Sequence, residues 1–197
     1  MLIINNKALK ITNKWLNPVA GSGPTPGPTP PGPSFDEVTI GTQTWMAKNL
    51  AIDDGQGGIY TQTVNYGEGN VVEYYYTWDA AVRVAASIDG WHLPSTSEWD
   101  DLATAVGGSD IAGTKLKSTT GWNSGNGDGS YGFAVFPAGR LYSGSFYNLG
   151  SGAYFWPADE LSSSNAYYCY FSTGETMNLD DCNKSFGYSV RLVKDAT

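Results

Sequence analysis

The stretch Trp91-His-Leu-Pro-Ser-Thr-Ser-Glu-Trp99 decides the centre of the fold. Pro94 lacks a backbone N–H, so the strand-like residues before it are expected to end there. Ser95 and Glu98 have the S-x-x-E spacing of a capping box, which predicts a helix over residues 95–106. Gly107-Gly108 follows directly and predicts the end of that helix.

The residues before this stretch predict a hairpin and a first helix. Residues 38–45 form two β-rich runs around Gly41, which is typical of a hairpin. Residues 76–86 repeat Ala and Val at helical spacing, and either Thr77 or Asp79 can cap that helix.

The residues after it predict strands and loops. From Lys115 onward, Gly, Ser and Asn separate short aromatic stretches, and residues 166–171 and 186–193 are the clearest strands. Two early helices followed by strands predict an α+β fold with a twisted, mostly antiparallel sheet and a loop-rich C-terminal half.

The N-terminal part differs in composition from the rest. Residues 1–19 are apolar and carry three lysines and no acid, which favours a segment that docks or assembles with its own copies or a partner. Residues 20–34 hold six prolines and four glycines and predict an extended linker. Residues 35–197 are long enough for one globular domain. A plain arm of that same fold is the alternative for residues 1–19.

Composition argues against several function classes. The formal net charge is −8, so binding to nucleic acid or insertion into an anionic membrane is not expected. No apolar run reaches the length of a membrane span, and the first residues lack the pattern of a secretory signal. The two cysteines, Cys169 and Cys182, could meet across a hairpin, but free thiols are the expectation.

Neither catalysis nor a cofactor or metal is indicated. His92, the single histidine, stands among apolar residues and is expected to be a buried, hydrogen-bonded structural residue. No serine has the G-x-S-x-G pattern of a nucleophile elbow. Residues 123–129 offer oxygen ligands but lack the carboxylates of an EF-hand loop, so a solvated turn is expected there.

Nine motifs follow one another in a fixed order: Val38–Leu50, Tyr76–Ala81, Gly90–Trp99, Lys115–Ser118, Gly121–Asn123, Tyr131–Phe133, Asn165–Tyr168, Asn183–Gly187 and Ser189–Arg191. This series resembles the Fibrobacter succinogenes major paralogous domain family over nearly all of residues 36–195. The resemblance implies a C-type lectin-like fold. Residues 91–99 are also similar to a segment of formylglycine-generating enzymes, but both cysteines lie elsewhere, so the resemblance implies that fold without that activity.

C-type lectin-like domains of this kind also resemble the variable proteins of diversity-generating retroelements, which bind receptors from phage tail fibres. Residues 156–161 and 174–182 differ from the sequence pattern that is usual in the family, whereas the residues around them match it. Either diversification of a binding surface or ordinary drift would produce this difference. The resemblance implies that Tyr168 and Tyr170 point inward and that Cys169 and Phe171 join the display surface. The expected ligand-binding residues are Phe155, Pro157, Asp159, Leu161, Cys169, Phe171, Thr173, Glu175, Met177, Leu179, Asp180, Asp181 and Cys182.

The sequence therefore predicts a non-enzymatic, hypervariable receptor-binding protein. Its expected partner is a cell-surface receptor, either protein or glycan, and its expected place is a phage or prophage tail assembled in the cytoplasm. A bacterial surface adhesin, a polysaccharide-binding module or a ligand-free structural surface domain are the alternatives.

Overall fold

The computed structural model describes residues 33–67 and 69–196. The expected assembly segment, residues 1–19, and most of the expected linker, residues 20–34, lie outside the described residues. None of the helices in the described part is long and apolar enough to cross a membrane.

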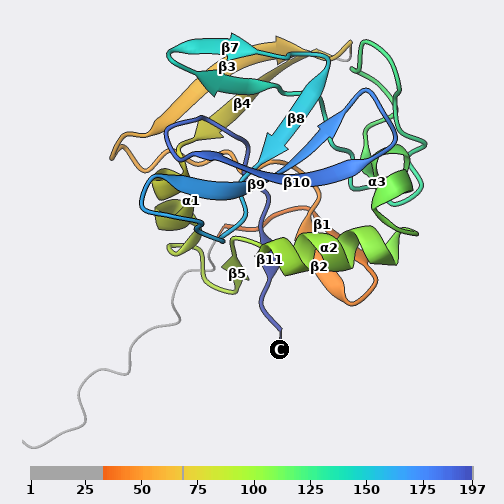
Figure 1. Ribbon diagram of the computed structural model, residues 1–197, viewed down its shortest axis with the longest axis horizontal. Helices are drawn as coiled ribbons and strands as arrows, with labels where there is room; N and C mark the ends of the chain where they lie inside the picture. The colour runs from red at the N-terminus through yellow and green to blue at the C-terminus, as the bar shows by residue number, and fades with distance from the viewer. Residues whose placement is uncertain (1–32, 68, 197) are drawn as a thin grey trace, which may run out of the picture. The chain divides into compact units, whose positions relative to one another are not determined.

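The described residues form three helices and four separate antiparallel sheets (Figure 1). The helices are α1 (Trp78–Ala85), α2 (Thr96–Ala105) and α3 (Ser109–Leu116). A four-stranded sheet has the order β1 (Glu37–Ile40), β2 (Gln43–Met46), β11 (Val193–Lys194) and β5 (Trp91–His92). The α+β class is confirmed, although the strands do not join into one sheet.

The other sheets are built from hairpins. A three-stranded sheet has the order β10 (Met177–Asn183), β9 (Asn165–Ser172) and β8 (Gly152–Phe155). Two further hairpins pair β3 (Ile59–Asn65) with β4 (Asn70–Tyr76), and β6 (Arg140–Tyr142) with β7 (Ser145–Tyr147).

The capping signals in the sequence are confirmed. The Ser95 side chain accepts from the backbone of Glu98, and Glu98 accepts from the backbone of Ser95, so α2 begins with a complete capping box. Thr77, and not Asp79, caps α1. Gly41 has a φ of +61° in the turn between β1 and β2, a conformation that glycine adopts without a steric penalty.

The expectation of two helices is wrong, because α3 was not predicted. Its N-cap is Gly108, which has no side chain to bond the first turn. Tertiary contacts hold this helix instead: the Gly113 N–H donates to the carbonyl of Glu175 at 2.6 Å. A Cβ on Gly113 would lie 2.5 Å from that oxygen, so this glycine allows the close approach of the helix to the β9–β10 turn.

The expected strand over residues 186–193 is only partly correct. Val193 begins β11, whereas Gly187, Tyr188 and Ser189 each bridge a different segment, namely Leu141, Tyr76 and Phe155. Residues 187–193 are buried throughout, so this segment runs through the interior and joins several sheets in turn.

Candidate binding surface

The hairpin of β9 and β10 carries most of the expected binding residues. Its register pairs Phe171 with Met177 and Tyr170 with Asn178. Since side chains alternate along a strand, the hairpin has one face with Cys169 and Phe171 and an opposite face with Tyr168 and Tyr170. Figure 1 shows α2 and α3 beside this hairpin.

The face with Cys169 and Phe171 belongs to the core. Both residues and Met177 are buried in one cluster with helix α2. The Trp99 ring of α2 lies 6.4 Å from that of Phe171 and 5.4 Å from that of Phe155. The expectation that Cys169 and Phe171 face a display surface is therefore wrong, because α2 covers that side of the sheet.

The opposite face is aromatic and half-exposed. Tyr168 and Tyr170 lie 5.6 Å apart between ring centroids, and the Tyr154 ring lies 6.1 Å from each of them. Tyr188 is buried beneath, with its ring 5.2 Å from that of Tyr168. Tyr168 and Tyr170 thus point toward this partly open side, and the expectation that they form the buried face is wrong.

The row of aromatic rings continues to the β6–β7 hairpin. Phe186 lies 5.8 Å from Tyr188 and stacks on Tyr142 at 4.4 Å, and Tyr147 lies 6.4 Å from Tyr142. Tyr142 and Tyr147 are nearly half exposed. The guanidinium of Arg140 lies over the Tyr154 ring at 5.1 Å. We call the half-exposed rings of this row the aromatic face: Tyr142, Tyr147, Tyr154, Tyr168, Tyr170 and Phe186.

Residues 156–161 and 174–182, the two stretches expected to vary, flank β9 on its two edges. On one side, the Tyr167 N–H donates to the carbonyl of Asp159 at 3.1 Å, and the Leu161 N–H donates to Asn165 at 3.0 Å. On the other side, Tyr167 pairs with Asp181 of β10. Residues 159–161 therefore flank β9 on the edge opposite β10. Residues about twenty positions apart in sequence thus lie at the same end of the hairpin.

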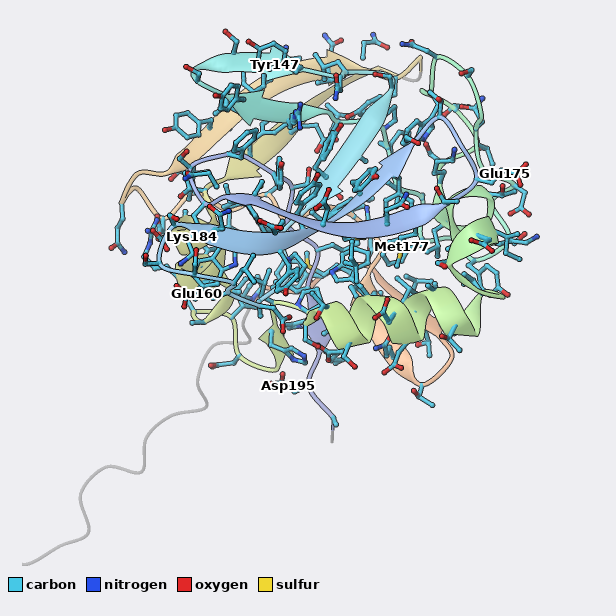
Figure 2. All side chains as sticks on the ribbon, in the orientation of Figure 1. Tyr147, Glu160, Glu175, Met177, Lys184 and Asp195 are labelled. Carbon is cyan, nitrogen blue, oxygen red and sulfur yellow. The ribbon has the colours of Figure 1, made fainter. Side chains whose placement is uncertain are left out.

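This end of the hairpin is also held by polar contacts. Lys184 forms an ion pair with Glu160, and Figure 2 shows these two residues together at one end of the hairpin, with Glu175 at the other. The Asp159 carboxylate accepts from the Thr96 N–H at the start of α2, at 2.7 Å. We call the surface formed by Asp159, Leu161, Tyr167, Tyr168, Asp180 and Asp181 the hairpin end.

The thirteen expected binding residues divide into two groups. Five are buried and cannot belong to an exposed surface, because they fill the interior: Phe155, Pro157, Cys169, Phe171 and Met177. Eight are exposed or half-buried: Asp159, Leu161, Thr173, Glu175, Leu179, Asp180, Asp181 and Cys182. Sequence reasoning missed Arg140, Tyr142, Tyr147 and Tyr154; their clustering in the aromatic stretch was visible, but their shared face was not.

The two cysteines are free, as expected. Cys169 faces the core, whereas Cys182 pairs with Ala166 and lies on the opposite face of the same sheet, so the two cannot meet across the hairpin. The Cys182 thiol donates to the Tyr188 hydroxyl at 3.2 Å. Burial raises the pKa of Cys182 to about 11, and burial holds the pKa of Cys169 well above its ordinary value.

His92 is hydrogen-bonded but not buried; it lies in β5, which precedes α2 and pairs with β11. Its Nε2 lies 2.8 Å from the Glu98 carboxylate and its Nδ1 lies 2.6 Å from that of Asp195. The side chain is 41% exposed. Burial lowers the pKa of His92, but the hydrogen bonds to Glu98 and Asp195 outweigh it, so the pKa is raised.

The glycine-rich loop over residues 123–129 is held by its own contacts. Asp128 accepts from Lys115 at 2.6 Å and from Ser130, and the Asn126 side chain accepts from the Trp122 N–H at 3.2 Å. The hydrogen bonds from Lys115 and Ser130 lower the pKa of Asp128. Within residues 33–67 and 69–196, no group of three His, Cys, Asp or Glu side chains is placed to hold a metal ion.

Comparison with known proteins gives one match. The family model described as the Fibrobacter succinogenes major domain matches residues 38–194. Neither the curated proteins nor the solved structures provide a match. Because the matched residues span well over half of the chain and include every described helix and strand except the first residue of β1, this chain belongs to the Fibrobacter succinogenes major domain family.

Proposed function

We propose that this chain is a non-enzymatic binding domain that recognises a cell-surface receptor through the hairpin end. The observation that carries the proposal is that residues 159–161 and β10 flank β9 on its two edges and leave Leu161, Asp180 and Asp181 exposed at one end of the hairpin. Diversification of one binding surface would act on neighbouring exposed positions of this kind.

The chemistry of the hairpin end supports recognition of a macromolecule. Asp180 and Asp181 are exposed on successive positions of β10, and Leu161, on the other side of β9, is 47% exposed. Tyrosines contribute large contact area with few rotatable bonds, and Tyr167 and Tyr168 lie half-buried on the two opposite faces of the hairpin end. Since β10 is an edge strand, a partner can reach both faces of the hairpin from one side.

We further propose that this domain is a variable receptor-binding protein carried on the tail of a phage or prophage. Residues 1–19 would attach it to tail proteins or to its own copies, and residues 20–34 would separate the attachment from the binding head. Several copies on one particle would raise a weak affinity through multivalent attachment.

The test of diversification is DNA sequencing of the locus in many clones. The proposal expects substitutions confined to the codons of residues 150–190, and a nearby near-repeat with adenines at the matching positions, beside a reverse transcriptase gene. Changes should concentrate at the exposed positions of the hairpin end and avoid Phe155, Cys169 and Phe171. A uniform locus without a near-repeat would contradict retroelement diversification and leave a fixed binding domain.

The test of binding uses whole cells of candidate host bacteria and the purified full chain. Asp180→Ala with Asp181→Ala should weaken cell attachment by about tenfold if these residues lie in a contact region. The matched control is Asp100→Ala with Asp101→Ala, which removes the same charge from the exposed side of α2. Equal attachment by both double variants would argue against the hairpin end.

The aromatic face favours a second candidate, a polysaccharide-binding module of a bacterial surface. Its rings expose flat apolar surfaces next to the Arg140 guanidinium, and such surfaces suit the C–H faces of sugar rings. Tyr147→Ala would weaken binding to isolated cell-wall polysaccharide under this alternative. The same substitution would leave attachment through the hairpin end unchanged.

A further inference from the structure

A cleft lies beside β4, separate from the hairpin end. Its volume is about 470 Å³. One wall is the edge of β4 over residues 69–74, and the other is the segment 47–51 that follows β2. Most of its lining is apolar, and none of the six residues of the hairpin end takes part in it. The apolar lining residues are Ala47, Leu50, Ala51, Val71, Val72, Ala134 and Phe136.

The backbone of β4 determines which groups face this cleft. Tyr76 exchanges two hydrogen bonds with Tyr188, at 2.8 and 3.0 Å, so its N–H and C=O point away from β3. In an antiparallel pair the direction of these groups alternates from residue to residue. The N–H and C=O of Val72 and Tyr74 therefore also point away from β3.

The segment that contains Tyr188 pairs with β4 at Tyr76 but not at Val72 or Tyr74. After Tyr188, the chain turns to the segment behind β2, where the Val190 carbonyl accepts from Leu50 and the Leu192 carbonyl accepts from Met46. The space left beside Val72 and Tyr74 is the cleft. Among the described residues, none forms a backbone hydrogen bond to Val72 or Tyr74 on this side.

This free edge carries no lysine, proline or bulge. Edge strands of natural proteins commonly carry lysine, proline or a bulge that discourages pairing with another chain. Residues 70–74 hold neither lysine nor proline, and their pairing with β3 is continuous. Val71 and Val72 are 46% and 51% exposed. Such an edge is a template for a further strand.

The charges around the cleft restrict which strand would fit. Glu73 is buried at the floor, where its carboxylate accepts from the Tyr66 hydroxyl and the Asn49 amide, both at 3.1 Å. Arg191 is also buried, but its guanidinium is already bonded to the Phe133 carbonyl and to Asn49. Lys48 at the rim pairs with Asp36 at 2.7 Å.

The net charge of the whole domain also limits which peptide could bind. Residues 35–197 carry eight basic and nineteen acidic side chains, a formal charge of −11. An acidic strand would be repelled by this field, whereas a neutral or basic strand would not be.

We infer that the free edge of β4 binds an extended peptide segment of a partner protein by strand addition. The segment is neutral or basic and alternates apolar residues. Its backbone pairs with the N–H and C=O of Val72 and Tyr74, and its inward side chains pack on Ala134 and Phe136. Backbone pairing supplies the affinity, and the apolar lining supplies the preference for alternating residues.

The experiment selects binders to the full chain from a short random peptide library displayed on phage. Hydrogen exchange is then measured on the full chain with the selected peptides. The inference expects protection of the Val72 and Tyr74 amides. The amides of Val71 and Glu73 should change little, because they already pair with β3. Methylation of alternate peptide nitrogens should remove binding, since it removes the pairing donors.

Two matched proline variants give the decisive comparison. Val72→Pro removes a donor from the cleft edge, and Thr63→Pro removes one from the opposite edge of the same hairpin, because Thr63 pairs directly with Val72. Proline is tolerated where an edge N–H faces solvent, so both variants should fold. Val72→Pro should weaken peptide binding by about tenfold or more, and Thr63→Pro by less than about twofold.

Three results would overturn the inference. The first is a selection whose peptides leave Val72 and Tyr74 unprotected. The second is equal weakening by Val72→Pro and Thr63→Pro. The third is protection of Val72 and Tyr74 that rises with protein concentration without peptide, which would assign the edge to a second copy of the chain. None of these results bears on the hairpin end, so the proposed function is tested separately.

Discussion

The two faces of β9 are equally rich in large side chains, yet one is core and the other is partly open. Phe171 and Cys169 are fully buried against α2, whereas Tyr168 and Tyr170 on the opposite face keep part of their rings exposed. The phenolic hydroxyl alone does not set this difference, because Tyr167 lies on the same face as Cys169 and Phe171 and is half-buried near the end of the strand. A buried hydroxyl without a partner is costly, so phenylalanine suits the part of that closed face that α2 covers.

The thiols on the two faces offer the sharpest test of this difference. Cys169 lies on the closed face and Cys182 on the other. We expect labelling of Cys169 to require global unfolding, which costs about 5–15 kcal/mol in a typical domain. Cys182 should react through local opening, slowly because burial raises its pKa to about 11. Timed thiol labelling followed by peptide mass analysis measures both rates.

Cys182→Ser provides the control, because it leaves Cys169 as the single thiol. Labelling of that variant should then follow the unfolding rate at every denaturant concentration. Rapid labelling of Cys169 in native buffer would mean that the closed face opens without unfolding.

Phe171→Ala should have the largest effect on stability among the substitutions of the hairpin. It removes a buried ring that packs on Trp99 and Phe155, and truncation of a buried phenylalanine costs about 3–5 kcal/mol. Denaturant unfolding followed by tryptophan fluorescence measures the change. A loss below about 1 kcal/mol would place Phe171 outside the core.

Tyr170→Ala is the matched change on the open face and should cost less, about 1 kcal/mol. Tyr170 is half-buried, and its ring pairs with that of Tyr154 at 6.1 Å and that of Tyr168 at 5.6 Å, so part of its contact area and two aromatic pairs are lost. The same unfolding measurement applies. Equal losses for Tyr170→Ala and Phe171→Ala would remove the distinction between the two faces.

The sequence predicts the elements whose signals are local. The capping box at Ser95 and Glu98, the cap at Thr77 and the turn at Gly41 each lie within a few residues of the structure they specify. Helix α3 could not be predicted in this way, because its N-cap is a glycine and its stability depends on the backbone of Glu175.

The candidate surface could not be predicted from local sequence signals either. Alternation separates Tyr168 and Tyr170 from Cys169 and Phe171, but both sets are aromatic or apolar, so alternation alone does not identify the buried set. The position of α2 decides it, and that position depends on contacts between residues distant in sequence. The cleft beside β4 likewise joins residues 47–51, 69–74 and Arg191, which no local pattern connects.

His92, which bonds the first turn of α2, gives the smallest expected effect on stability. Its substitution tests what keeps α2 packed on the face of β9 that carries Cys169 and Phe171. His92 bonds Glu98 in the first turn of α2 and Asp195 behind β11, and a ring that donates at both nitrogens is protonated. Because the folded pKa of His92 is raised, its contribution to stability is complete below the unfolded pKa, which is about 6.5. The contribution disappears as the pH rises through the folded pKa.

His92→Gln should therefore destabilise the protein by about 0.5–1 kcal/mol near pH 5, since the ring is half-exposed and its ion pairs are weakened by solvent. The difference from the unsubstituted protein should shrink at alkaline pH, as urea unfolding at a series of pH values can show. Lys194→Gln is the control, because it removes an exposed ion pair of the same sheet, Lys194–Glu37 at 2.7 Å, that contains no histidine. If the His92→Gln difference does not vary with pH, the neutral ring holds α2 as well as the protonated ring does. The charge of His92 would then contribute nothing to keeping α2 on this face.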